Sequence, residues 1–318
     1  MAHAEERRMA RLREELEESG LPAEPDDGLR TLLLEEVDRA LRPEVHERRI
    51  PSSGTIVEPR AAPDAWTSGT GLDISHVPIG AMSIELHDAR RYVDGLSSWL
   101  VRRIEPGQND FLLFDRPAGS ERDLVVLAES MRASVVQRHP SGPVRIVGPF
   151  GVLRWEGLRW HREPPISTWL DALEKDGGPG DLEVLGALLR LAVHDLGALG
   201  IGALLVYQLG TDVAARIEER LSSPPPLRVR KATHLAPLRH AIAQVDGAAF
   251  FDRDGVLRRL GVELLANTER DRLLPPWRGT RHTAALRYSD EDPASVVIVV
   301  SEDGPVTVMR KGVPIERS

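Results

Sequence analysis

The sequence predicts an α/β protein with two domains, and three observations support this fold class. The chain has 318 residues, which is enough for two hydrophobic cores. In its C-terminal part, short apolar runs alternate with helical patterns, which predicts a mixed sheet flanked by helices. A Gly-Gly-Pro-Gly segment at residues 177–180 marks the expected boundary. We therefore predict a helical segment over residues 1–50, a separate α/β or α+β domain over residues 70–176, and the sheet domain over residues 181–318.

The N-terminal segment is predicted to form two helices. Residues 3–19 are rich in Glu, Arg, Ala and Leu, with apolar side chains on one face, and residues 29–41 repeat this pattern after a break at residues 22–27. The polar face is mixed in sign, which argues against a role at a membrane surface. We expect a helical hairpin that packs on the next domain or forms a dimer contact.

The following region is predicted to contain a linker and then mixed elements. Residues 51–71 are rich in Pro, Ser, Gly and Thr, which indicates a linker or long loop. After it we predict helices over residues 90–101 and 123–137 and strands over residues 110–114, 144–147 and 152–155. Trp155, Trp160 and Trp169 are interpreted as core or interface residues rather than as a ligand-binding box.

The C-terminal domain has the clearest pattern of alternating elements. Asp181 is a candidate cap for a helix that extends to about Leu199. Asp254-Gly255 between two apolar runs predicts a hairpin. The full prediction is strands over residues 201–207, 247–252, 256–264, 295–301 and 306–310, with helices over residues 234–243 and 280–288.

Composition excludes several classes of function. The chain has no cysteine, so it has neither disulfides nor a thiolate nucleophile. Its charged N-terminus does not resemble a signal peptide, and the longest apolar stretch, residues 185–209, contains Arg190, His194 and Asp195, which disfavours a membrane span. We expect a cytoplasmic protein that binds no membrane.

The charge distribution favours an anionic ligand at the C-terminal part. The net charge is −8, but the residues from Leu185 onward carry 18 basic and 16 acidic side chains. This excess is too small for a surface that binds duplex DNA, and 4% aromatic residues do not favour base stacking. We therefore expect no nucleic-acid partner.

Two segments carry the residues that indicate chemistry. Val245-Asp246-Gly247-Ala248 places a carboxylate and a glycine at the head of an apolar strand. Gly279-Thr280-Arg281-His282 places a hydroxyl, a guanidinium and an imidazole at the start of a helix, where backbone N–H groups bind phosphates. A carboxylate can hold a metal ion or accept a proton from a hydroxyl. Together the two segments predict a site for a nucleoside triphosphate.

Structural alternatives exist for each of these residues. Asp246 alone would be interpreted as a turn cap, and His282 alone as a hydrogen-bonded structural histidine. The second motif favours chemistry for both residues. Glu302, at a predicted hairpin, is equally compatible with a solvated turn and with a site residue.

The order of these motifs resembles the diadenylate cyclase domain, also called the DisA-type nucleotide-binding domain. The resemblance covers residues 185–318 and includes Ile-Gly-Ala-Leu-Leu-Val at 201–206, Asp-Gly-Ala at 246–248, Gly-Thr-Arg-His at 279–282 and a strand that ends in Ser-Glu at 301–302. The family joins two ATP molecules into cyclic di-AMP, with one ATP in each of two subunits that meet face to face. The resemblance therefore implies ATP as substrate, cyclic di-AMP as product, Mg²⁺ or Mn²⁺ as cofactor, and a homodimer or higher homo-oligomer.

The resemblance also assigns roles to individual residues. It implies that Asp246, Arg281 and His282 are catalytic and that Asp246 also binds the metal ion. The residues implied in ATP binding are Gly247, Ala248, Leu264, Gly279, Thr280, Thr283, Ser301 and Glu302.

The sequence departs from the family pattern at Thr283, where arginine is usual. A lost charged hydrogen bond costs roughly 1.5–3 kcal/mol, so we expect a weakened enzyme rather than an inactive one. Arg287, one helical turn on, is a candidate substitute. The alternatives are a nucleotide-binding sensor of the same fold without turnover, and an enzyme with an altered dinucleotide product. The chain resembles the soluble branch of the family, whose variable N-terminal domain is expected to regulate the cyclase as a sensor.

Overall fold

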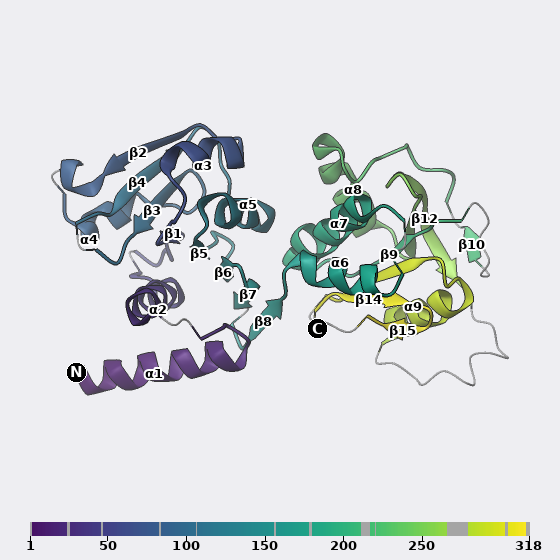
Figure 1. Ribbon diagram of the computed structural model, residues 1–318, viewed down its shortest axis with the longest axis horizontal. Helices are drawn as coiled ribbons and strands as arrows, with labels where there is room; N and C mark the ends of the chain where they lie inside the picture. The colour runs from purple at the N-terminus through teal and green to yellow at the C-terminus, as the bar shows by residue number, and fades with distance from the viewer. Residues whose placement is uncertain are drawn as a thin grey trace. The chain divides into compact units, whose positions relative to one another are not determined.

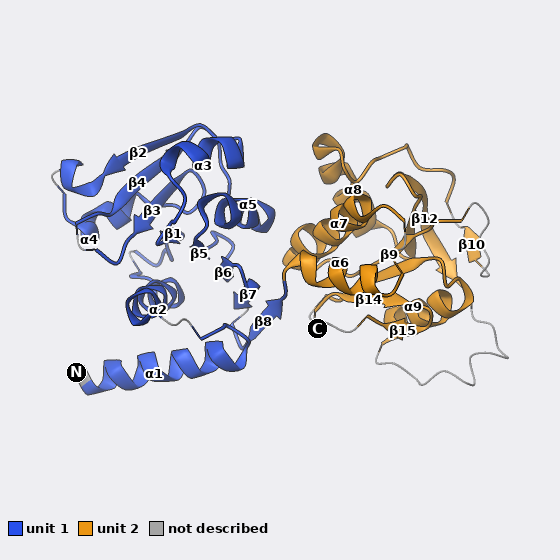
Figure 2. Ribbon diagram, viewed as in Figure 1, with its two compact units in different colours: residues 1–164 blue, residues 165–318 orange. Residues whose placement is uncertain are grey.

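The computed structural model divides residues 1–318 into two compact units, residues 1–164 and residues 165–318 (Figure 2). It describes residues 2–23, 26–45, 47–82, 84–105, 107–155, 157–177, 180–210, 217–219, 221–265, 279–302 and 305–315. Each unit has its own sheet and its own core (Figure 1).

The first unit is built on an eight-stranded sheet with the strand order β2-β4-β3-β1-β5-β6-β7-β8. Among the described strands of this sheet, β1 and β3 pair in parallel and all other neighbours pair antiparallel. The strands are β1 (Ser53–Val57), β2 (Ile74–Pro78), β3 (Ser98–Arg102), β4 (Asp110–Phe114), β5 (Ser134–Arg138), β6 (Val144–Gly148), β7 (Gly151–Trp155) and β8 (Trp160–Glu163).

Helices cover both faces of this sheet. Helices α1 (Ala2–Glu18) and α2 (Asp27–Leu41) form an apolar cluster with β1, β5, β6 and β7 on one face. Helices α3 (Pro63–Thr70) and α5 (Glu121–Met131) form a second cluster on the other face. The short helices η1 (Ile79–Met82), α4 (Leu86–Ala89) and η2 (Arg90–Tyr92) complete the unit. The predicted helical hairpin is therefore confirmed, and it packs on the sheet of its own unit.

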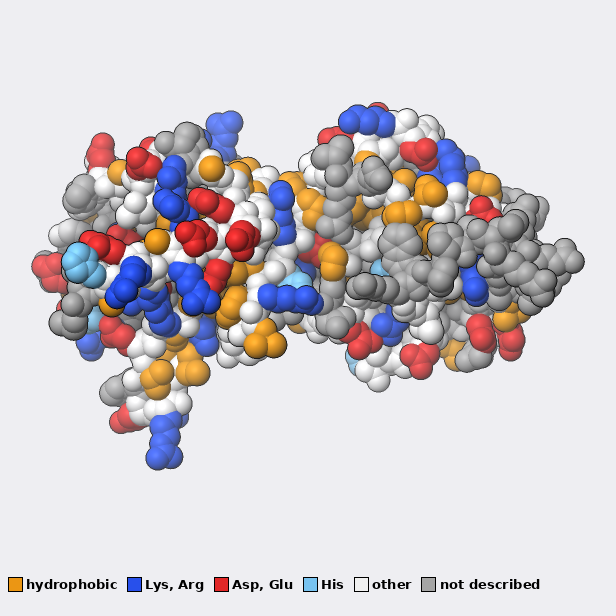
Figure 3. Space-filling model, turned by 90° about the horizontal axis from the view of Figure 1, so that it is seen from below, with side chains coloured by type: hydrophobic (Ala, Val, Ile, Leu, Met, Phe, Trp, Pro, Cys, Tyr) orange, Lys and Arg blue, Asp and Glu red, His pale blue; other side chains and the backbone are white. Residues whose placement is uncertain are grey.

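The polar sides of α1 and α2 carry alternating charges. Arg8 pairs with Asp38 at 3.0 Å, and Arg11 pairs with Glu15 at 2.8 Å. On the face shown in Figure 3, basic and acidic side chains of the described residues are likewise interspersed. Such alternation favours solvated helix faces over a region of one sign.

Three predicted elements of this unit are wrong. Residues 51–71 contain β1 and α3 rather than a linker, because the short Gly54–Val57 run is buried at the centre of the sheet between β3 and β5. Residues 90–101 contain η2 and then β3, since the Asp94 carboxylate accepts hydrogen bonds from the next backbone N–H groups and Gly95 turns the chain at φ +69°.

The third error concerns residues 123–137, where one helix was predicted. Helix α5 ends at Met131, and Arg132 follows in the left-handed conformation. The β-branched pair Val135-Val136 then lies in β5, buried between β1 and β6.

The predicted role of the tryptophans in the core is supported. Trp169 is 1% exposed and Trp160 is 9% exposed, and the Trp155 and Trp160 rings pack with centroids 5.4 Å apart.

The second unit is built on a seven-stranded mixed sheet with the strand order β10-β12-β11-β9-β13-β14-β15. Strands β9 and β11 are parallel, and the other neighbouring strands described in this sheet are antiparallel. The strands are β9 (Ala203–Tyr207), β10 (Ile217–Glu219), β11 (Ala248–Phe251), β12 (Leu257–Leu264), β13 (Val296–Val300), β14 (Thr307–Arg310) and β15 (Val313–Pro314). The predicted mixed sheet flanked by helices is thereby confirmed.

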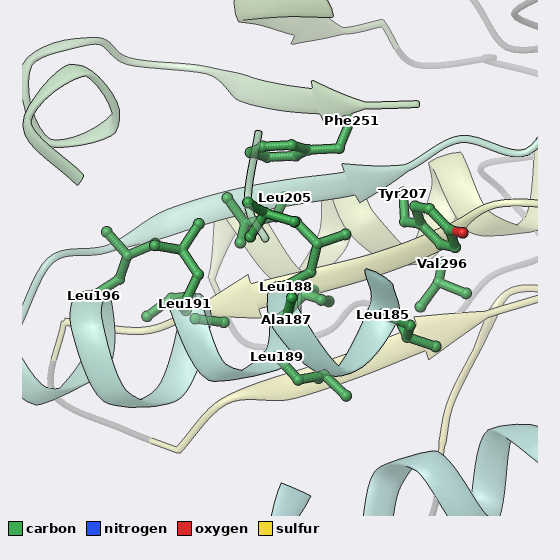
Figure 4. Packing of buried hydrophobic residues seen from close by; sticks show 14 of the residues in the cluster. Leu185, Ala187, Leu188, Leu189, Leu191, Leu196, Leu205, Tyr207, Phe251 and Val296 are labelled. Atoms are coloured by element: carbon green, nitrogen blue, oxygen red, sulfur yellow. The ribbon is translucent and has the colours of Figure 1, made fainter. Parts of the chain in front are cut away.

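Helices cover both faces of the second sheet as well. The larger cluster contains residues of α6 (Ile166–Lys175), α7 (Leu182–Arg190) with its continuation η3 (Leu191–Leu196), and α8 (Ala232–Gln244). Figure 4 shows its leucines from α7 and η3 together with Leu205 of β9 and Phe251 of β11. The short helix η4 (Gly197–Leu199) ends this run, and the Asp181 carboxylate caps its beginning as predicted. On the opposite face, α9 (Thr280–Glu291) packs on alternate residues of the same strands.

The division between the units falls earlier than the predicted boundary at residues 177–180. Helix α6 belongs to the second unit, where Trp169 and Leu173 are buried in the larger cluster. At the end of α6, Asp176 accepts hydrogen bonds from Arg310 at 2.6 Å and from Lys311 at 3.1 Å. These bonds connect α6 to the β14–β15 turn.

None of the helices within the described ranges is long and apolar enough to cross a bilayer.

Candidate functional site

Four chain segments meet at one end of the strands in the second sheet. Strands β9 and β11 are parallel, with Ala248 opposite Leu204, so residues 246–247 and residue 202 precede their strands side by side. Strand β12 is antiparallel to β11, with Val262 opposite Ala248, and therefore finishes at this end with Leu264. Strand β13 is antiparallel to β9, with Val300 opposite Ala203, so Ser301 and Glu302 leave the sheet here too. Segments far apart in the sequence thus share one end of the sheet.

The turn before β11 exposes a carboxylate beside a position that only glycine fits. Gly247 has φ +105°, and a Cβ atom there would lie 2.7 Å from the carbonyl carbon of Gly261 on β12. The backbone at residues 246–247 therefore packs directly on β12. Asp246 remains exposed. Ala248, in contrast, is 2% exposed and belongs to the cluster beneath α9, so its side chain is part of the core.

Helix α9 brings the second motif to the same end of the sheet. Its buried residues Ala285, Leu286 and Tyr288 pack on the strands and fix the position of the helix. A Cβ atom on Gly202 would lie 2.2 Å from Arg281 Nη1 and 2.8 Å from Glu302 Cγ. The Arg281 guanidinium therefore lies over Gly202, next to Glu302.

Arg281 and Glu302 form an ion pair. Arg281 Nη1 donates to Glu302 Oε1 at 2.9 Å, with the two side chains 42% and 63% exposed. An ion pair this exposed contributes about 0–1 kcal/mol to stability. The guanidinium is consequently held in place by an interaction that an anionic ligand can replace.

His282 lies deeper than Arg281. Its Nε2 atom is 3.3 Å from Oγ1 of Thr307, at the start of β14. Partial burial lowers the pKa of His282 below its usual value of 6.5, so the imidazole is neutral at neutral pH. A neutral ring in this position can donate one hydrogen bond and accept another.

A pocket of about 410 Å³ opens along α9. It is lined by four residues of the predicted site, Leu264, Gly279, Thr280 and Thr283. The remaining lining residues are Leu265, Ala284, Arg287, Tyr288 and Glu291. Its volume lies within the usual range for small-molecule sites.

Four of the lining residues were not among the predicted site residues, namely Leu265, Ala284, Tyr288 and Glu291. Tyr288 is 3% exposed and packs edge-on against Phe250, with ring centroids 5.6 Å apart. Burial, and next the charge of nearby Asp292, raises the pKa of its phenol, so the hydroxyl keeps its proton. One sequence pattern could have pointed to Glu291. It lies on the same predicted helix face as Thr280, Thr283 and Arg287.

The structure therefore groups the predicted residues in three ways. One group lines the pocket along α9 and consists of Leu264, Gly279, Thr280 and Thr283. A second group is the ion pair of Arg281 and Glu302 over Gly202. Asp246, Gly247 and Ser301 share this end of the sheet by register. Thr283 Oγ1 donates to the carbonyl of Gly279 at 3.0 Å.

Comparison with known families assigns a description to each unit. Residues 11–163 match the family model described as "Probable sensor domain DACNK", and residues 190–313 match the model described as "DisA bacterial checkpoint controller nucleotide-binding". No curated protein matches the chain.

Solved structures that match the chain include a hypothetical membrane spanning protein from Bacillus cereus. It is 22% identical, with a TM-score of 0.36, and the match covers 46% of this chain and 68% of that chain. Another is a double mutant of DacA from Staphylococcus aureus, which is 17% identical with a TM-score of 0.29, and the match covers 43% of this chain and 87% of that chain.

Proposed function

Because the chain belongs to the DisA-type nucleotide-binding family through residues 190–313 and carries a probable sensor domain over residues 11–163, we propose that it is a diadenylate cyclase regulated by that sensor domain. It would join two ATP molecules into cyclic di-AMP and release two pyrophosphates. The observation that carries the proposal is the meeting of the Asp246 turn, the start of α9 and the end of β13 at one end of the sheet.

In the proposed reaction, the 3′-hydroxyl oxygen of one ATP attacks the α-phosphorus of the other. The new P–O bond forms as the bond to pyrophosphate breaks, and the hydroxyl proton leaves to the Asp246 carboxylate or to water. The same step in the opposite direction closes the ring. Because the described part of one chain offers one such site, we propose that two chains face each other in a homodimer or higher homo-oligomer.

The triphosphate would lie at the start of α9. There the backbone N–H groups of the first turn and the hydroxyl of Thr280 are donors. Arg281 would leave Glu302 for a phosphate, since charge-assisted bonds to phosphate are stronger than an exposed ion pair. His282, neutral and anchored near Thr307, would donate a hydrogen bond.

The adenine would occupy the pocket along α9. Leu264 and Ala284 provide apolar surface there, and Tyr288 also lines the pocket. An aromatic base would be stabilised by this contact and by its removal from water.

The residues present fit a divalent ion held jointly with substrate. Within the described ranges, no three His, Asp or Glu side chains gather as a metal site. Mg²⁺ in phosphoryl-transfer sites commonly takes one or two carboxylates together with substrate phosphates, and the exposed Asp246 carboxylate meets that need. When bound, Mg²⁺ or Mn²⁺ would neutralise phosphate charge.

The direct test is product analysis with purified protein, ATP and Mn²⁺. We expect cyclic di-AMP by chromatography and mass spectrometry, and its loss in Asp246→Asn. Asp254→Asn is the matched control, because Asp254 lies exposed in the β11–β12 turn at the opposite end of these strands. Equal activity in wild type and Asp246→Asn would refute the assigned role of Asp246.

A second candidate function is nucleotide binding without turnover. It is favoured by Thr283, whose hydroxyl is directed to the Gly279 carbonyl, where the family commonly has an arginine. ATP or cyclic di-AMP binding without product under Mg²⁺ and Mn²⁺ would support it. Recovery of product in Thr283→Arg would then show that this residue is the cause, and the same product analysis would detect an altered dinucleotide.

A further inference from the structure

A second pocket lies inside the first unit and has the features of a ligand site. It has a volume of about 300 Å³ and is bounded by α1, α2, the residues after β1, the turn after α5 and the β6–β7 turn. We propose that it binds a small organic anion with an apolar body, and that this is the ligand of the sensor domain.

The floor of the pocket is apolar and largely withdrawn from water. Five apolar residues line it, each of them 9% exposed or less: Leu33, Leu34, Val57, Ala133 and Phe150. An apolar group that enters this space is desolvated at about 25 cal/mol for each Å² that it buries. The floor therefore selects for an apolar body.

The opening of the pocket is basic. The charged lining residues are four arginines and two glutamates: Arg13, Arg30, Arg60, Arg132, Glu17 and Glu58. The Glu58 carboxylate already accepts the backbone N–H of Ile104 at 2.7 Å, and Glu17 lies 3.8 Å from Arg13. In the part of the chain that the structure describes, Arg60 and Arg132 are exposed, and their guanidinium groups have neither an ion-pair nor a hydrogen-bond partner. Two unpaired cations above an apolar floor favour an anionic head group.

Arg132 occupies a backbone position that normally selects another residue. It caps the C-terminus of α5 with φ +52°, where glycine is preferred. Glu58, which also lines the pocket, has φ +48°. The left-handed backbone therefore costs more with arginine than it would with glycine, and Arg132 lines the pocket. Strained backbone of this kind is concentrated at functional sites.

The pocket wall contacts the last strand of the unit. The carbonyl of Phe150 accepts hydrogen bonds from Arg162 on β8 at 3.4 Å. A Cβ atom on the next residue, Gly151, would lie 2.1 Å from the carbonyl oxygen of Glu163. A ligand that moves Phe150 therefore acts on the strand through which the chain leaves the sensor domain.

The binding test uses the full chain and three probes of matched chemistry. Octanoate has the apolar body and the charge, 1-octanol has only the body, and acetate has only the charge. In calorimetric titrations we expect one octanoate for each chain, with the other two probes at least roughly tenfold weaker because each lacks one of the two interactions. Absence of octanoate binding, or equal binding of octanoate and octanol, would overturn the proposal.

Variants locate the binding site independently of activity. Arg60→Gln and Arg132→Gly should each weaken octanoate binding roughly tenfold, whereas Arg49→Gln, an exposed position outside the pocket, should not. Arg132→Gly should also melt no lower than wild type, because glycine relieves the left-handed backbone. Unchanged binding in both pocket variants would place octanoate elsewhere and refute the site.

The regulatory consequence rests on the proposed cyclase function. Octanoate should change the rate of cyclic di-AMP formation in wild type and leave Arg60→Gln unaffected at the same concentration. Binding without any change in rate would refute the coupling while leaving the site intact. Absence of product with and without octanoate would refute the cyclase and not the pocket.

Discussion

Gly202 shows how a single hydrogen atom in place of a side chain makes room for a site residue. The motif at residues 201–206 contains this glycine but assigns it no role, yet the Arg281 guanidinium lies directly over it, within reach of Glu302. The motif residues themselves could be predicted, because their types and order indicate phosphate chemistry. Their contacts could not, since the pairing of residues 281 and 302 depends on how α9 packs against the ends of β9 and β13.

Gly202→Ala should separate binding from stability. The added Cβ would lie 2.2 Å from the end of the flexible Arg281 side chain, which can move away. We expect a stability loss below about 1 kcal/mol but roughly tenfold weaker ATP binding. Thermal melts and equilibrium titration measure the two effects. Gly80→Ala is the control, since a Cβ atom there meets nothing within 4 Å. Wild-type ATP affinity in Gly202→Ala would show that Arg281 takes no part in binding.

His282 predicts a stability change with pH. Burial lowers its folded-state pKa below 6.5, so between these two values the unfolded chain binds the proton more readily than the folded chain. Its contribution is fully present above pH 6.5 and is lost as the pH falls through the folded pKa. Denaturant melts between pH 5 and pH 8 compare wild type with His282→Gln. The free energy of unfolding should fall more steeply toward acid pH in wild type than in the variant. Parallel curves would contradict this.

At the scale of elements, α2 is held to the first sheet by a buried carboxylate. Glu36 is 3% exposed, and it accepts hydrogen bonds from Arg90 at 2.5 and 2.7 Å and from Arg102 at 2.7 Å. Burial acts to raise the pKa of Glu36, but the hydrogen bond and charge of Arg90 and the charge of Arg102 together lower it. Arg90 and Arg102 lie 54 and 66 positions from Glu36 in the sequence. No local sequence pattern could therefore predict this cluster.

Glu36→Gln should destabilise the first unit by about 3–5 kcal/mol, because it leaves the largely buried Arg90 without its counter-charge and leaves Arg102 with only the more distant Glu35. Glu35→Gln is the matched control, since Glu35 is 53% exposed and lies 3.7 Å from Arg102. Chemical denaturation followed by circular dichroism compares the two. Equal stability of both variants would contradict the structural role of Glu36.

The elements that sequence reasoning found share a physical feature. The C-terminal strands and helices carry uninterrupted apolar runs or clear caps, as with Asp181 and the Asp254-Gly255 turn. In the first unit, β1 and β3 are central strands of five residues each, flanked by Pro, Gly or Ser. Strands this short are stabilised by neighbours distant in the sequence, and local propensity alone does not reveal them.

At the scale of the whole molecule, the division at residues 164–165 determines which fragments fold. Helix α6 buries Trp169 and Leu173 in the core of the second unit, and Asp176 binds Arg310. The predicted boundary at residues 177–180 would separate α6 from this core.

A fragment of residues 165–318 should therefore unfold cooperatively, whereas a fragment of residues 181–318 should be less stable by more than about 3 kcal/mol, the usual cost of removing one large buried side chain. Urea unfolding of both fragments, monitored by circular dichroism, is the measurement. The single substitution Asp176→Ala in the longer fragment tests the hydrogen bonds from Arg310 and Lys311 to Asp176 by themselves. Asp171→Ala, at an exposed position, is the control. Equal stability of the two fragments would show that α6 is dispensable.

The turn between β6 and β7 has a consequence for the evolution of such chains. At Gly151, where φ is +99° and the Glu163 carbonyl leaves no space, every other amino acid is excluded on steric grounds. Genetic drift can alter the surrounding loop, but it cannot alter this position without changing the path of the polypeptide at the end of the first unit. An invariant glycine here would thus be a marker by which distant homologues with the same interdomain exit could be recognised in genome surveys.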